Sequence, residues 1–122
     1  MMAKLLIAVR SEILAAALAD ALTEYEVRVC HTGTEALAVL ESQWPDILLV
    51  ELSLPWGSGL SVLQETGYKP PVILALTNIL GESILQAAAD AGVQDMVLLP
   101  STVPNILRHL AALMQKRPAP EA

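Results

Sequence analysis

Runs of apolar residues alternate with segments of helical periodicity along the whole chain. Continuous apolar character is typical of strands that are covered on both faces, and a shorter run alternates like a half-buried strand. We expect the five strands at residues 4–9, 26–30, 46–51, 72–77 and 94–99. Helical periodicity and capping residues predict five helices between and after them, at about 11–24, 34–42, 60–65, 81–92 and 104–116.

Such regular alternation predicts an α/β fold with a parallel sheet, because right-handed crossovers place the connecting helices on both faces. Ligands of these sheets bind at the carboxyl ends of the strands. The residues at these ends are therefore the first candidates for a functional site: Val9–Arg10, Cys30–His31, Glu51, Thr77 and Leu99–Pro100.

Length and composition limit the possible functions. The 122 residues suit one domain, which we expect to span 1–116, with 117–122 as a tail or the stub of a linker. An apolar content of 54% argues against disorder. The net charge of −6 and the lack of a basic run argue against direct nucleic-acid binding by this domain. No apolar run approaches the roughly 20 residues of a membrane span.

The few cysteine and histidine residues offer little chemistry. Cys30 is the only cysteine, which favours a reducing, cytoplasmic setting and a buried structural thiol. His31 either faces the rim of the strand ends or is solvated, and we favour the latter. His109 is expected at the surface, and neither histidine has an evident carboxylate partner or metal-ligand spacing.

Three segments in order resemble one family. "PDILLVELSLPWGSGL" (45–60), "GTEAL" (33–37) and "AADAGVQDMVLLP" (88–100) are similar to the third strand, second helix and fifth strand of response-regulator receiver domains of the chemotaxis type. The resemblance covers about residues 4–116. It implies a flavodoxin-like sheet of order 2-1-3-4-5 and a role in two-component phosphorelay signal transduction.

The resemblance also implies a chemistry. In this family an Asp takes a phosphoryl group from a histidine-kinase phosphohistidine, with a magnesium ion held by that Asp, an acidic pair and a backbone carbonyl. Residue by residue, the acceptor falls on Glu51, the acidic pair on Val9 and Arg10, and the carbonyl on Ser53. The hydroxyl that ends the fourth strand falls on Thr77 and the lysine that ends the fifth on Leu99. Pro100 is kept, where family members place a cis peptide bond.

These substitutions predict a degenerate site. Magnesium prefers an octahedron of oxygen ligands, and an aliphatic and a cationic residue replace the acidic pair. We therefore expect no metal or other cofactor, no enzymatic activity, and a phosphorylation-independent regulatory or protein-interaction module. We favour an ion pair between Glu51 and Arg10 over two solvated side chains. The alternatives are a conventional phosphoacceptor with unusual ligands and a flavodoxin-like small-ligand binder, although a Gly-rich phosphate loop is missing.

The surface residues suggest a partner. The last helix carries two apolar stripes, Ile106–Leu110–Leu113 and Leu107–Ala111–Met114, and one stripe is enough to cover a sheet. In receivers this helix forms a common dimerisation face with the fourth helix and fifth strand. We expect a homodimer or a protein partner there, or else a wide buried face. Trp56 would cover the old phosphorylation pocket, anchor a partner or pack within its loop.

Overall fold

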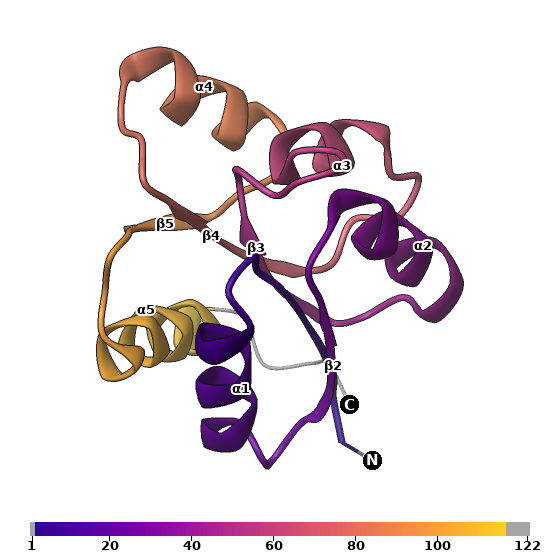
Figure 1. Ribbon diagram of the computed structural model, residues 1–122, viewed down its shortest axis with the longest axis vertical. Coiled ribbons are helices and arrows are strands. Elements are labelled where there is room, and N and C mark those ends of the chain that lie inside the picture. Colours follow the sequence, from indigo (N-terminus) through magenta and orange to yellow (C-terminus); the bar gives the residue numbers. More distant parts are fainter. Residues whose placement is uncertain (1, 117–122) are drawn as a thin grey trace.

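A five-stranded parallel sheet forms the central layer of the computed structural model, which describes residues 2–116 (Figure 1). The strands are β1 (Lys4–Ala8), β2 (Glu26–Cys30), β3 (Ile47–Glu51), β4 (Val72–Thr77) and β5 (Asp95–Leu98). Their spatial order is β2-β1-β3-β4-β5, and every neighbouring pair is parallel. The predicted fold class and strand order are confirmed.

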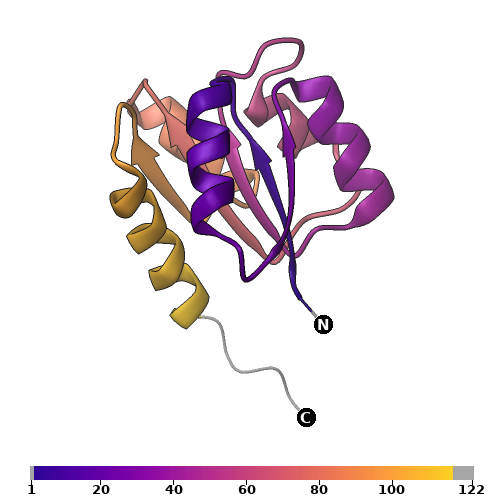
Figure 2. The same ribbon diagram turned by 60° about the horizontal axis from the view of Figure 1, so that its bottom comes forward.

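Helices cover both faces of the sheet. They are α1 (Glu12–Ala21), α2 (Gly33–Gln43), α3 (Gly59–Glu65), α4 (Glu82–Asp90) and α5 (Val103–Lys116). Figures 1 and 2 show α1 and α5 on one face and α2, α3 and α4 on the other. Alternate residues of β1 divide between two cores: Leu5 and Ile7 pack toward α1 and α5, whereas Leu6 and Ala8 pack toward α2 and α3. All residues of β3 and β4 are buried, which explains their continuous apolar sequences.

Side-chain caps fix where the first two helices begin. The Ser11 hydroxyl accepts a hydrogen bond from Leu14 N–H at 3.1 Å, so the predicted cap of α1 is confirmed. Thr32 caps α2 in the same way, and its hydroxyl donates a hydrogen bond to the Glu35 carboxylate at 3.0 Å. The predicted end of α1 at Glu24 is wrong. The helix ends at Ala21, because Leu22 leaves helical geometry and bonds back to Ala19.

The loop between β3 and α3 is held against the start of α2. Gly33 N–H donates to Pro55 O and Thr34 N–H donates to Trp56 O, both at 2.9 Å. A Cβ on Gly33 would lie 1.7 Å from Gly57 O, so the two backbones meet only because position 33 has no side chain. These contacts give the loop that follows β3 one defined position next to the strand ends.

Candidate functional site

The carboxylate of Glu51 lies at the carboxyl end of β3 and is 8% exposed. Its Oε1 accepts a hydrogen bond from the main-chain N–H of Arg10 at 2.8 Å. The Ser53 hydroxyl donates to Oε2 at 3.3 Å. Both oxygens of this nearly buried anion therefore have a partner, which is what a charge at this depth requires.

The predicted ion pair between Glu51 and Arg10 is wrong. Among residues 2–116 the Arg10 guanidinium lies within 4 Å of no carboxylate, and its side chain is exposed. Only the backbone of Arg10 contacts Glu51, through the N–H that donates to Oε1.

The other acidic-pair position, Val9, is bound through its backbone. Its N–H donates to Cys30 O at 3.2 Å, and its carbonyl lies 2.9 Å from His31 Nδ1. Because a carbonyl only accepts, Nδ1 carries the ring proton. His31 is thus half-buried at the rim of the site, and the expectation of a solvated histidine is wrong.

The thiol of Cys30 is buried at the carboxyl end of β2. Burial, and to a lesser degree the negative charge of Glu35, raise the pKa of Cys30 to about 12. A thiol with so high a pKa is protonated at neutral pH and is a poor nucleophile. The structure therefore agrees with a structural role for this residue.

Thr77 and Leu99 occupy the ends of the next two strands without contacting Glu51 by a hydrogen bond. The Thr77 hydroxyl donates to Ile79 O at 3.0 Å and accepts from Ile79 N–H at 3.1 Å. Leu99 packs against the core next to α5. The peptide bond between Leu99 and Pro100 is cis, as the resemblance implied.

The indole of Trp56 projects into solvent. It is 80% exposed, while the carbonyl of the same residue accepts hydrogen bonds from Thr34 N–H at 2.9 Å and Thr34 Oγ1 at 3.1 Å. The side chain therefore neither covers the site nor packs within its loop. Of the three predicted roles, only that of a partner anchor is compatible with this exposure.

Two features of α5 differ from expectation. His109 Nδ1 lies 2.7 Å from Asp95 Oδ2 on β5, a carboxylate partner that no sequence spacing indicated. Ile106, Leu110 and Leu113 are buried as predicted. The second stripe instead lines a groove between α5 and the end of α1: Leu107, Ala111 and Met114 line it together with Leu22 and Tyr25.

Within the described part of the chain, no three His, Cys, Asp or Glu side chains gather as potential metal ligands. None of the helices between residues 2 and 116 combines the length and apolar character needed to cross a membrane.

Comparisons with known proteins place this geometry in a family. The family model described as response regulator receiver domain matches residues 7–111. Response regulator MprA of Mycobacterium avium is 36% identical over 95 residues, which cover 75% of this chain and 41% of that protein. MprA of Mycobacterium tuberculosis is 35% identical over the same shares. The chain thus spans about two fifths of the length of these relatives.

Solved structures agree on the fold. A CheY-like receiver domain protein from Methanospirillum hungatei has a TM-score of 0.84 at 18% identity, covering 95% of this chain and 96% of that one. The receiver domain of HemR from Leptospira biflexa also scores 0.84, at 20% identity, covering 98% and 99%. The chain belongs to the response regulator receiver domain family, the class that acts in two-component signalling. Receiver domains of this class interact with proteins such as kinases.

Proposed function

We propose that this domain is an atypical receiver, a regulatory module that binds proteins without being phosphorylated and without enzymatic activity. One observation carries the proposal: Glu51 stands at the acceptor position and its Oε1 accepts the Arg10 N–H at 2.8 Å. This bond joins the ends of β3 and β1, where the family resemblance places the metal. The single, free and buried Cys30 agrees with a reducing, cytoplasmic setting.

The donor set does not fit magnesium. The ion requires an octahedron of oxygens with carboxylates among them, and Val9 offers only a buried aliphatic side chain. Arg10 directs an N–H donor, not an oxygen, toward Glu51. Without a metal or a lysine at position 99, little would stabilise the charge that develops during phosphoryl transfer. The longer side chain of Glu51 also places its oxygens differently from those of an aspartate.

A permanent imitation of the phosphorylated state has less support. That state would need Thr77 and the residue at position 99 to recognise the carboxylate. The Thr77 hydroxyl donates its proton to Ile79 O and accepts a hydrogen bond from Ile79 N–H, and Leu99 has no side-chain donor. A single state that does not depend on a signal fits these contacts better.

The proposal includes a partner surface on α4 and β5. Leu80, Leu85 and Leu98 are each about half exposed, and a groove between α4 and β5 is lined by Leu80, Leu85 and Met96. Exposed apolar side chains gathered in this way mark interaction sites. We propose that a second copy or another protein binds there.

Phosphorylation is tested directly by incubation with acetyl phosphate and magnesium, followed by intact-mass measurement. The expected result is an unchanged mass. A gain of one phosphoryl group, located on Glu51 by its loss in Glu51→Gln, would overturn the proposal in favour of a conventional phosphoacceptor.

The partner surface is tested by sedimentation of the chain over a concentration series. Leu85→Glu and Leu98→Glu should reduce self-association, whereas Ile13→Glu should not, because Ile13 is 85% exposed on α1. If all three variants sediment like the unmodified chain, this surface does not mediate self-association.

A further inference from the structure

Strand β2 is unusually open for a parallel strand. It forms one edge of the sheet and pairs only with β1. Glu26 and Arg28 are exposed, Val27 is half-buried and Val29 is 37% exposed. Parallel strands are normally covered on both faces, as β3 and β4 are here. An edge strand with exposed residues is a template for another strand.

The hydrogen bonds to β1 show which groups of β2 are free for such pairing. Glu26 N–H donates to Ala3 O at 2.9 Å, and Cys30 O accepts from Val9 N–H at 3.2 Å. Backbone groups alternate in direction along a strand, so Arg28 also faces β1. Val27 and Val29 therefore direct their N–H and C=O groups outward, away from the sheet.

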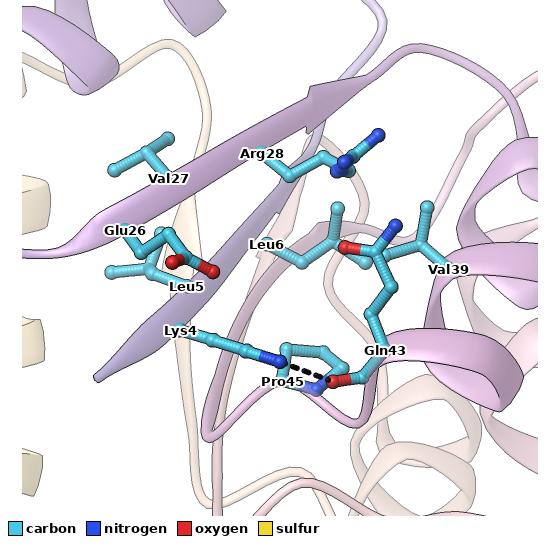
Figure 3. Close-up of a pocket in the computed structure, with 9 residues that line it drawn as sticks. All are labelled: Lys4, Leu5, Leu6, Glu26, Val27, Arg28, Val39, Gln43 and Pro45. Carbon is cyan, nitrogen blue, oxygen red and sulfur yellow. Dashed lines mark hydrogen bonds between the residues drawn. The ribbon is translucent and has the colours of Figure 1, made fainter. Parts of the chain in front are cut away.

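Two residues of opposite charge, Glu26 and Arg28, lie on either side of Val27. Glu26 and Arg28 flank it on the same face, opposite Lys4 and Leu6 of β1 (Figure 3). Neither residue takes part in an ion pair among residues 2–116. A cavity of about 120 Å³ separates this face of β2 from the side chains of Val39 and Gln43, so the strand is not sealed by α2.

We propose that β2 pairs with β2 of a second copy, in an antiparallel arrangement with its two-fold axis at Val27. In this register Glu26 stands opposite Arg28 of the second copy, and Arg28 opposite its Glu26. The two Val27 residues exchange both N–H···O bonds, since their backbone groups already point outward. Each Val29 N–H lies opposite Tyr25 of the other copy, whose carbonyl accepts it.

The charge pattern is what selects a second copy as the occupant. Opposite charges directly across antiparallel strands are favourable, and like charges are unfavourable. The sequence Glu26-Val27-Arg28 complements itself only in the antiparallel direction. Five-residue strands bury little area, so the dimer is weak and depends on concentration. It also lies at the opposite edge of the sheet from β5, and is independent of the surface proposed above.

Charge reversal tests the proposal, and a second reversal should restore the association. The measured quantity is the dissociation constant of the dimer from sedimentation equilibrium. Glu26→Arg and Arg28→Glu each place like charges opposite one another, and each should weaken self-association by at least about tenfold. An equimolar mixture of the two variants should associate again, because positions 26 and 28 are both Arg in one variant and both Glu in the other, so opposite charges face each other in the mixed dimer. The double variant Glu26→Arg/Arg28→Glu should dimerise like the unmodified chain.

Two matched controls change the charge equally. Glu24→Arg lies outside the paired charges, and Arg108→Glu lies on α5; both should leave the dissociation constant unchanged. Protection of the Val27 and Val29 amides from hydrogen exchange should rise with protein concentration. The proposal is overturned by a monomer at millimolar concentration, by single reversals that associate normally, or by a mixture that stays monomeric. Association that is lost only in Leu98→Glu would also overturn it and would assign self-association to α4 and β5.

Discussion

Glu51 on β3 accepts a hydrogen bond from the main-chain N–H of Arg10, just beyond β1, with 2.8 Å between the two heavy atoms. The donor belongs to the backbone, so it does not depend on which side chain stands at position 10. This distinguishes the contact from an ion pair and makes the two side chains separable by mutation.

Replacing each residue separately tests this relationship. Glu51→Gln should lower the free energy of unfolding by about 1 kcal/mol, because hydrogen bonds to a charged acceptor are stronger than those to an amide. Arg10→Ala should change it by less than about 0.5 kcal/mol, since the exposed guanidinium forms no ion pair with any residue between 2 and 116. In urea unfolding the double variant should be additive within about 0.5 kcal/mol. A coupling above that value would indicate a side-chain interaction.

Magnesium should have no specific effect on the unmodified chain. Its melting temperature should be the same in magnesium chloride and in sodium chloride of equal ionic strength. The triple variant Val9→Asp, Arg10→Asp and Glu51→Asp supplies three carboxylates at the strand ends, and its melting temperature should rise with magnesium through binding to the folded state. A comparable rise in the unmodified chain would contradict the proposed loss of the metal.

Gly33 should tolerate no side chain. A Cβ there would meet Gly57 O at 1.7 Å, so Gly33→Ala must separate α2 from the loop that follows β3. We expect a loss of about 2–4 kcal/mol in the free energy of unfolding. Gly67→Ala is the control, because a Cβ at that position meets nothing within 4 Å, and it should change stability by less than about 1 kcal/mol. Equal effects in thermal or urea unfolding would show that the close contact does not restrict position 33.

Cys30 should make stability fall in alkaline solution. Burial raises the pKa of its thiol from 9.0 to about 12, so between these values the unfolded chain loses a proton that the folded chain keeps. The stabilisation is complete below pH 9 and is lost as the pH rises toward 12. Cys30→Ala should show a shallower decline over this range. Parallel curves for the two proteins would contradict the raised pKa.

The fold was predictable because its strongest signals are local. Strands β3 and β4 are buried on both faces, and their unbroken apolar sequences follow directly from that burial. The same holds for Ser11, whose hydroxyl caps the helix that begins one residue later. Position along the chain also identified Glu51 as the residue at the end of the third strand.

The contacts of the site were less predictable, because they depend on directions in space. Sequence reasoning paired Glu51 with the charged side chain of Arg10, whereas the backbone of that residue makes the contact. Asp95 and His109 meet across the packing of β5 against α5, and no spacing rule connects residues on two such elements. Likewise, the sequence showed the stripe formed by Leu107, Ala111 and Met114. It did not show that this stripe lines a groove with the end of α1.

Thr77 has a consequence for how such a domain would be controlled. Its hydroxyl forms both of its hydrogen bonds with the backbone of Ile79, two residues away, so local contacts hold the connection between β4 and α4. If the domain is not phosphorylated, as proposed, Thr77 transmits no change at Glu51 to α4. The fraction of partner bound then follows mass action alone. The cell would set the output through the amount of this protein that it synthesises and degrades.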